Sequence, residues 1–448
     1  MWRLWPRLIE QATAPSVRNA ALSFVHFVVV HGRGERYTTM LKTLRHVFAP
    51  TALYRGEGVC GGVALHRVGG GAWDERLLPS SVASDDGAPG ALVVDGRRAR
   101  SPAALREVFD VVRGTARALA KTGGRLVLVG DARRARSGDC EAAMFAEGLE
   151  GFARSAAKEL GPSGATATYL RVARDADGAA ASPSLRFLLS GRSAYVSGAS
   201  FEAGAAAVAA VADEAWPAGD DAHSPVRGLR VVLTGGAAGI GAATAARLSD
   251  AGADVLVVDR APGPGVDGVV DVVAADAPAR LRDMADARFG GPVDAVVHNA
   301  GVTRDRTLFR MGDDEWDACL DVNALAPRRL TAALDLAEDA SVVLLGSTSG
   351  VAGNAGQANY AAAKSALFGW AAAATTYRVN AVAPGFIASA MTAKMPFANR
   401  FVGARFNNLG RPGTPEDVAN VIAHLASPAS GAIRGQVVRC CGGFLQGR

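Results

Sequence analysis

The chain has 448 residues, of which 49% are hydrophobic, 20% charged and only 6% aromatic. This length predicts two or three domains, with enough apolar side chains for two packed cores. The 48 basic and 43 acidic residues give a net charge of +5, and this small, dispersed excess does not indicate a nucleic-acid-binding protein.

We expect neither a secretion signal nor a membrane span in the N-terminal region. Its longest apolar run, FVHFVVV at 24–30, has the length of a strand, far short of the roughly 20 residues that cross a bilayer. The five cysteines have neither a CxxC pattern nor the spacing of metal ligands. We therefore expect a reduced, cytoplasmic protein with no metal site and no membrane partner.

The first half of the chain alternates strand-like and helix-like segments. ALVVD (91–95) and RLVLVGD (125–131) have the length and composition of buried strands, and LEGFARSAAKEL (149–160) has the spacing of an amphipathic helix. HGRGER (31–36) has two glycines of a nucleotide-binding turn but lacks the third. We expect residues 1–215 to form an α/β domain that binds no dinucleotide.

A polar stretch, DEAWPAGDDAHSPVRG at 213–228, divides the chain into halves of similar size. Its Pro and Gly residues do not favour a continuing helix. We interpret 216–228 as a linker and 229–448 as a second domain.

The second half opens with a strand, a glycine-rich turn, a helix and a second strand between 229 and 261. Gly235, Gly239 and Gly241 lie between the first strand and the helix, which is the context that a dinucleotide-binding turn requires. Gly235 would make the tight turn, and the other two would let the helix N-terminus approach a pyrophosphate. A plain strand-to-helix connection is the alternative interpretation.

The second strand of this unit ends at Asp259, next to Arg260. A carboxylate at this position accepts hydrogen bonds from the adenosine ribose and repels a 2′-phosphate. The guanidinium of Arg260 would reduce that repulsion, but Asp259 is the closer group. The sequence therefore favours NADH over NADPH.

Later strands are predicted near 294–301, 341–347, 377–385 and 435–440, and they complete a doubly wound parallel sheet. Within this region, NYAAAK places Tyr360 and Lys364 one helical turn apart. The two residues are either an ordinary pair on one helix face or a tyrosine whose pKa is lowered by a nearby ammonium.

Three segments of the first half resemble segments of the second half in the same order: 125–131 with 341–347, 143–155 with the helix that follows Tyr360, and 188–198 with 425–435. This shared order favours an internal duplication over a chance likeness between two α/β domains. The first copy carries Asp131, Ala142 and Ala146 at the positions of Ser347, Tyr360 and Lys364. The first half therefore lacks the side chains of the candidate site.

Five motifs of the second half resemble those of the short-chain dehydrogenase/reductases: TGGAAGIG (234–241), HNAG (298–301), DVNALAP (321–327), GSTSGVAGNAGQANYAAAK (346–364) and VNAVAPGFIASAMT (379–392). Within that family they are similar to the 3-oxoacyl-acyl-carrier-protein reductases. The long first half and TRDRTLFRM (303–311) resemble the high-molecular-weight branch, whose N-terminal portion is a degenerate flavodoxin-like α/β domain. The resemblance implies an α/β chain in which a doubly wound parallel (Rossmann) catalytic domain follows that degenerate domain.

The resemblance also implies a role for each of four residues. The Ser347 hydroxyl, thirteen residues before Tyr360, would hold the substrate carbonyl oxygen while Tyr360 donates a proton to it. Lys364 would bind the nicotinamide ribose, and Asn323 would order a water relay behind the lysine. Plain structural roles are the alternative: a helix cap for Asn323 and a strand-end cap for Ser349.

The cofactor-binding residues that the resemblance implies are Gly235, Gly239, Ile240, Gly241, Asp259, Arg260, Asp276, Asn299, Ala300, Gly301, Tyr360, Lys364, Pro384, Gly385 and Ile387. The implied activity is NAD(P)H-dependent reduction of 3-oxoacyl thioesters, carried on acyl carrier protein or coenzyme A, in fatty-acid metabolism. Oxidation of a 3-hydroxyacyl-CoA or another secondary alcohol is an alternative, because the same site can run backwards. A non-catalytic nucleotide-binding subunit is an alternative of another class.

Relatives pair their subunits through the helix that follows Tyr360, so we expect a homodimer. From Lys364 to Asn380 is 16 residues, whereas the first copy runs 22 residues from Ala146 to Thr168. This shortening predicts a weakened or altered oligomer. Four arginines would meet an acidic carrier protein, although scattered surface arginines are the more common explanation: Arg304, Arg306, Arg328 and Arg329.

Overall fold

The computed structural model describes residues 62–68, 89–132, 140–172, 178–204, 225–393, 403 and 405–444. The predictions for 24–30 and 31–36, Cys60 and most of the proposed linker lie outside these residues. The domain boundaries at 215 and 228 therefore stay predictions. Among the helices in the described ranges, none is both long enough and apolar enough to cross a membrane.

In the described part of the first half, five strands form one parallel sheet in the order of the sequence. Its strands are β1 (Val63–Arg67), β2 (Ala91–Asp95), β3 (Arg125–Asp131), β4 (Thr166–Val172) and β5 (Ser200–Ala203). Every residue of β2 and β3 is buried, as expected for parallel strands whose two faces are both covered by helices. The predicted strands at 91–95 and 125–131 are confirmed.

The helices of the first half are α4 (Pro102–Thr122), α5 (Cys140–Leu160) and α6 (Gly178–Leu189), with short 3₁₀ turns η2 (Gly161–Ser163) and η3 (Gly191–Ser193). Local signals set the ends of α4. The Ser101 hydroxyl accepts a hydrogen bond from the Ala104 amide at 3.2 Å, and Gly123 ends the helix with φ +64°.

The second half forms a parallel sheet of seven described strands in the order β12-β11-β10-β9-β6-β7-β8. Its strands are β6 (Arg230–Thr234), β7 (Asp254–Asp259), β8 (Gly268–Val269), β9 (Val293–His298), β10 (Leu336–Leu345), β11 (Arg378–Pro384) and β12 (Val437–Cys440). The chain moves outward from β6 to β8 and then crosses back to β9, so the strand order reverses between β6 and β9. Ligands bind at the carboxyl ends of strands beside such a reversal. The predicted α/β fold with a doubly wound parallel sheet is confirmed.

The helices of the second half are α7 (Gly239–Asp250), α8 (Ala277–Phe289), α9 (Asp313–Leu320), α10 (Ala326–Ala333), α11 (Thr348–Ala352), α12 (Ala358–Ala373), α13 (Ala390–Ala393) and α15 (Pro415–Ala426). Between α9 and α10 lies one turn of π-helix, Asp321–Leu325. Short 3₁₀ turns are η5 (Leu308–Arg310) and η7 (Pro428–Ser430). Helix α12 has 16 residues, whereas α5 has 21, in agreement with the shorter second copy.

The two halves repeat one arrangement, as the sequence echoes predicted. Strands β1 to β5 follow one another in the same spatial order as β6, β9, β10, β11 and β12. The turn after α6 and the turn after α15 also share their hydrogen bonds. The Ser193 hydroxyl donates to Leu188 O at 2.8 Å, and the Ser430 hydroxyl donates to Leu425 O at 2.9 Å.

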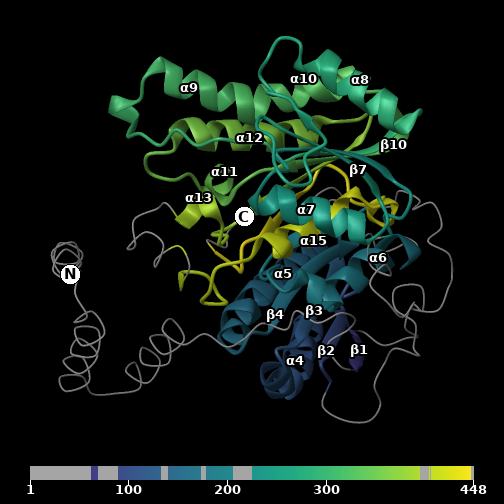
Figure 1. Cartoon of the computed structure of the whole chain (residues 1–448). Helices are drawn as coiled ribbons and strands as arrows, with labels where there is room; N and C mark the ends of the chain where they lie inside the picture. Colours follow the sequence, from purple (N-terminus) through teal and green to yellow (C-terminus); the bar gives the residue numbers. More distant parts are fainter. Residues whose placement is uncertain are drawn as a thin grey trace.

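The two sheets share one core where their last strands meet. In Figure 1 the first half, in blue and dark teal, lies below the second half, and α6 approaches α15. The rings of Phe187 and His424 stack with centroids 4.5 Å apart. Next to them, the Gly204 amide donates to Ala432 O at 2.7 Å, and the Gly442 amide donates to the carbonyl of Tyr195 at 2.9 Å. The reciprocal bonds give the contact the form of a two-fold interface within one chain.

Candidate active site

The glycine-rich turn brings the ends of β6 and β9 into close contact. Gly235 has φ +71°, and a Cβ there would lie 2.6 Å from the Cα of Ala300. A Cβ on Gly241 would lie 2.0 Å from Gly235 O. The Asn299 amide donates to that same carbonyl at 2.6 Å. Only glycines allow this approach of three backbone segments, and the resulting cradle fits a dinucleotide pyrophosphate.

The start of α7 closes this cradle. Gly239 is its first residue, with φ +57°, and Ile240 follows it. The backbone amides at this end point toward the carboxyl edge of the sheet, where they can bind an anion. A Cβ on Gly239 would lie 3.9 Å from Ser389, so the segment after β11 reaches the same edge.

Asp259 ends β7, and its carboxylate accepts a hydrogen bond from the Ala237 amide in the glycine-rich turn at 3.0 Å. The carboxylate is therefore held at the mouth of the cradle, while Arg260 is exposed. Asp276 lies further away in sequence, as the N-cap residue of α8. Asp271, which the motifs did not single out, lies two residues after the end of β8 and accepts a hydrogen bond from the Val273 amide at 3.2 Å.

Ser347 and Tyr360 meet beyond the end of β10. Ser347 is the N-cap of α11, and its hydroxyl accepts a hydrogen bond from the Ser349 amide at 3.1 Å. Tyr360 is half-buried on α12. Burial raises the pKa of Tyr360 to about 12, against a hydrogen bond with Ser347 that acts in the opposite direction. The serine and the phenol therefore lie within hydrogen-bonding reach, and the strand-end cap is Ser347 rather than Ser349.

Lys364 lies under Tyr360, with its ammonium 5.5 Å from the centre of the phenol ring. The lysine is 2% exposed, and its Nζ donates to Leu345 O at 2.6 Å. Burial lowers the pKa of Lys364 to about 8. The expected lowering of the Tyr360 pKa is not found, because burial of the phenol is the largest cause of its shift and raises the pKa.

Asn323 lies in the π-helical turn and is 1% exposed. Its amide nitrogen donates to Val302 O at 2.9 Å and to Cys319 O at 2.8 Å, and its oxygen accepts from the Val302 amide at 3.2 Å. A Cβ on Gly301 would lie 2.7 Å from this oxygen and 3.4 Å from the Lys364 Nζ. Gly301 therefore lets Asn323 and Lys364 approach each other. Such π-turns often occur at functional sites, and Asn323 is not a helix cap.

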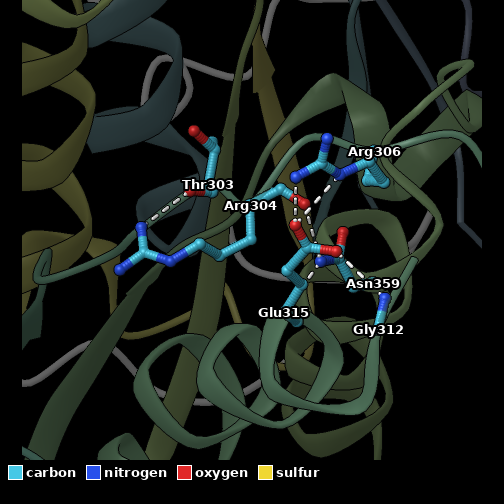
Figure 2. Close-up of polar contacts among 6 residues, drawn as sticks. All are labelled: Thr303, Arg304, Arg306, Gly312, Glu315 and Asn359. Atoms are coloured by element: carbon cyan, nitrogen blue, oxygen red, sulfur yellow. Dashed lines mark hydrogen bonds and ion pairs between the residues drawn. The ribbon is translucent and has the colours of Figure 1, made fainter. Parts of the chain in front are cut away.

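Asn359 fixes the start of α12, and the motifs gave no sign of its role. Figure 2 shows its amide between the loop after β9 and helix α9. Its nitrogen donates to Arg304 O at 3.0 Å and to Glu315 O at 2.9 Å, while its oxygen accepts from the Tyr360 amide at 2.7 Å. The side chain is fully buried. Asn359 therefore ties the backbone of Tyr360 to two neighbouring segments.

The predicted nicotinamide-side residues follow β11. Pro384 is the last residue of that strand, and the Gly385 amide donates to Cys440 O at 3.0 Å. Ile387 forms an isolated parallel bridge with Gly413. The structure therefore brings these residues to the same edge of the sheet as the glycine-rich turn, Ser347 and the ends of β6, β9 and β10.

The predicted surface arginines take part in local contacts. Arg306 binds one carboxylate oxygen of Glu315 through two nitrogens at 3.0 and 2.8 Å, as Figure 2 shows. Arg304 donates to Thr303 O at 3.0 Å, and the guanidinium of Arg328 lies 5.1 Å from the ring centre of Trp370. Arg329 is exposed.

Within the described ranges, no group of three or more His, Cys, Asp or Glu side chains could hold a metal ion.

Comparison with known proteins concerns the second half. The family described as "Enoyl-(Acyl carrier protein) reductase" matches residues 235–445.

Named relatives align with about half of the chain and almost all of their own length. The 3-oxoacyl-[acyl-carrier-protein] reductase FabG of Thermotoga maritima is 36% identical over 243 residues, covering 49% of this chain and 99% of the relative. The FabG protein of Escherichia coli is 34% identical over 239 residues, covering 48% and 97%. The (3R)-3-hydroxyacyl-CoA dehydrogenase of Mus musculus is 34% identical over 252 residues, covering 49% and 97%. Through its second half, the chain belongs to the short-chain dehydrogenase/reductase family of oxidoreductases.

Proposed function

We propose that this protein reduces the 3-oxo group of an acyl thioester, carried on coenzyme A or acyl carrier protein, with NADH preferred as hydride donor. The family implies a nicotinamide dinucleotide, and the bound dinucleotide would supply the hydride. Two of the relatives described above are named as 3-oxoacyl-[acyl-carrier-protein] reductases, which supports a thioester substrate.

The observation that carries the proposal is the position of Tyr360 beside Ser347 and above the buried Lys364. A phenol with a pKa of about 12 is protonated at neutral pH, which is the form that donates a proton. Tyr360 would protonate the substrate oxygen as hydride reaches C3, and the Ser347 hydroxyl would hold that oxygen in place. Asn323, whose side-chain oxygen lies near Gly301 as the Lys364 Nζ does, would anchor the water that returns the proton.

The dinucleotide would be held by the glycine cradle and by Asp259. The amides at the start of α7 would bind the pyrophosphate, and Lys364 would donate to the nicotinamide ribose. The segment Pro384–Ile387 would contact the nicotinamide. The carboxylate of Asp259 favours a ribose with free hydroxyls, since a 2′-phosphate would bring two negative charges against it.

Oxidation of a 3-hydroxyacyl-CoA is the second candidate, and the name of the mouse relative favours it. The same residues would serve, but the tyrosine must then accept a proton as phenolate. The assay in both directions described below separates this candidate from the reduction. A non-catalytic subunit would not need the buried ammonium next to a phenol.

The test is a nicotinamide absorbance assay with acetoacetyl-CoA as substrate, followed in both directions. We expect oxidation of NADH that depends on the thioester, with a higher kcat/KM than for oxidation of 3-hydroxybutyryl-CoA by NAD⁺ at neutral pH. Binding of NADH without turnover of either thioester would refute the proposed substrate class. The absence of dinucleotide binding would refute the proposed activity.

A further inference from the structure

Tyr195 of the first half is completely buried against the second half. It follows the turn η3, and its backbone oxygen accepts the Gly442 amide at 2.9 Å. Its hydroxyl lies 3.0 Å from Arg411 O and 3.4 Å from Phe386 O, and it accepts from the Asn407 amide at 3.3 Å. One phenol of the first half thus reaches three residues of the second.

Phe386 and Arg411 lie near the two ends of the connection from β11 to α15. The two limbs of that connection are joined by backbone hydrogen bonds. The Gly413 amide donates to Phe386 O at 3.0 Å, and the Ala388 amide donates to Gly413 O at 2.9 Å. Tyr195 lies at this junction, directly beside the Pro384–Ile387 segment proposed to contact the nicotinamide.

The ring of Tyr195 fits closely between glycines of the second half. A Cβ on Gly413 would lie 2.6 Å from the ring, and a Cβ on Gly442 would lie 2.8 Å from it. Both distances are far below van der Waals contact, so the backbone of both segments touches the ring. Because of this packing, the position of the ring and the position of the loop junction depend on each other.

Among the described residues, the tyrosine at this interface comes from the first half. The equivalent residue of the second copy is Ala432, whose backbone oxygen accepts the Gly204 amide as Tyr195 O accepts the Gly442 amide. The backbone contacts are thus repeated, but the side chain is not. Thirty residues separate β11 from α15, whereas five separate β4 from α6. The phenol therefore faces a long connection that the first half does not have.

We propose that Tyr195 is a positioning residue through which the first half fixes the Pro384–Ile387 segment against the bound dinucleotide. The inference rests on the proposed dinucleotide site but not on the identity of the substrate. Burial raises the pKa of Tyr195 well above its ordinary value, so the hydroxyl is protonated at neutral pH and can donate to these carbonyls.

The test compares Tyr195→Phe with Tyr169→Phe in the full-length chain. Tyr169 is a matched control, because it is 1% exposed, belongs to the first half and donates its hydroxyl to Ala146 O at 3.0 Å. The dissociation constant for NADH is measured by fluorescence, and KM and kcat with acetoacetyl-CoA. We expect Tyr195→Phe to weaken NADH binding and raise its KM by roughly three- to tenfold, as for one hydrogen bond, with a smaller change in kcat.

Hydrogen exchange separates positioning from general destabilisation. In Tyr195→Phe the Ala388 and Gly413 amides should exchange faster, while amides of β6 and β7 keep their wild-type rates. Wild-type NADH affinity in Tyr195→Phe, or equal weakening in Tyr169→Phe, would overturn the inference. If Tyr195→Phe does not fold, Asn407→Ala gives the same test, because the side-chain amide of Asn407 donates to Arg411 O at 2.8 Å. Wild-type protein that binds NADH but does not reduce acetoacetyl-CoA would refute only the proposed substrate.

Discussion

The two halves share one arrangement of strands and helices, but their buried charged groups have different partners. In the first half, Asp95 at the end of β2 accepts two hydrogen bonds of 2.9 Å from Arg97, and both side chains are almost fully buried. Glu150 on α5 is held by Arg171 at 2.9 and 3.0 Å. In the second half, the described contact of the Lys364 ammonium is a backbone carbonyl, not a carboxylate.

This difference explains how one arrangement can serve as support in one half and as a reaction site in the other. A buried ion pair neutralises its own charges and leaves little field for a ligand. A buried ammonium next to a phenol keeps an unbalanced charge, and such groups with displaced pKa values are typical of active sites. The comparison predicts that substitutions of equal chemical size will change catalysis in the second half, whereas in the first half, Tyr195 excepted, they will change only stability.

The largest expected effect is that of Tyr360→Phe. Loss of the proton donor should lower kcat by about 10²- to 10⁴-fold, while the melting temperature stays close to that of the wild type. The control is Tyr169→Phe in the first half, which removes a buried hydroxyl from β4 and should keep wild-type kcat. The assignment of Tyr360 fails if Tyr360→Phe retains more than about a tenth of the wild-type kcat.

The residues that sequence motifs could predict are those whose role depends on the backbone nearby. Gly235 and Gly241 follow from the strand, turn and helix around them, and the structure gives both the close contacts that exclude a Cβ. Ser347 follows from the end of a strand. The doubly wound order follows from the alternation of strands and helices.

What the sequence could not supply depends on contacts between distant segments. The side chain of Asn359 bonds to Arg304 and Glu315, 55 and 44 residues away, and Tyr195 contacts a loop almost 200 residues later. The pKa of Tyr360 was expected to be lowered by Lys364, because charge and spacing are visible in a sequence. The burial that raises this pKa instead depends on how distant segments pack around the phenol.

The second prediction compares Gly241→Ala with Gly130→Ala. Each new Cβ would collide with its neighbour, at 2.0 Å from Gly235 O in one case and 1.8 Å from the Tyr169 hydroxyl in the other. Both substitutions should lower the free energy of unfolding, by about 1–3 kcal/mol. Only Gly241→Ala should weaken NADH binding, by more than about tenfold. Equal loss of NADH affinity in both variants would mean that the effect is one of stability alone.

A smaller effect is expected for Asp259→Ala, measured as the ratio of kcat/KM with NADH to kcat/KM with NADPH. The wild type should prefer NADH. Removal of the carboxylate should reduce this preference by about tenfold, which is the change in affinity expected when one charge-assisted hydrogen bond is lost. Asp254→Ala is the control, since that residue lies at the opposite end of the same strand and pairs with Arg288 at 2.8 Å. A wild type that uses NADPH better would make Arg260 the deciding group.

The last prediction is a gradual dependence on pH that arises in the second half, because Ala146 stands in the repeat where Lys364 stands. Lys364 is an ammonium below its pKa of about 8 and neutral above it. Tyr360, with a pKa of about 12, keeps its proton throughout this range. We therefore expect kcat/KM for acetoacetyl-CoA reduction to be level below about pH 8 and to fall above it, by at most tenfold per pH unit.

Unfolding through Lys364 cannot produce that decline. Its pKa is lower in the folded chain than in the unfolded chain, so between about pH 8 and the ordinary lysine pKa the unfolded state binds more protons. Titration of Lys364 therefore increases the stability of the fold as the pH rises through this range, while the reaction loses its ammonium. Activity and the melting temperature should be measured together from about pH 6 to about pH 10, with Lys121→Ala of α4 as the control that keeps the wild-type profile. If kcat/KM begins to fall only near pH 10, the buried ammonium keeps an ordinary pKa. If kcat/KM falls together with the melting temperature, the loss of activity is due to unfolding.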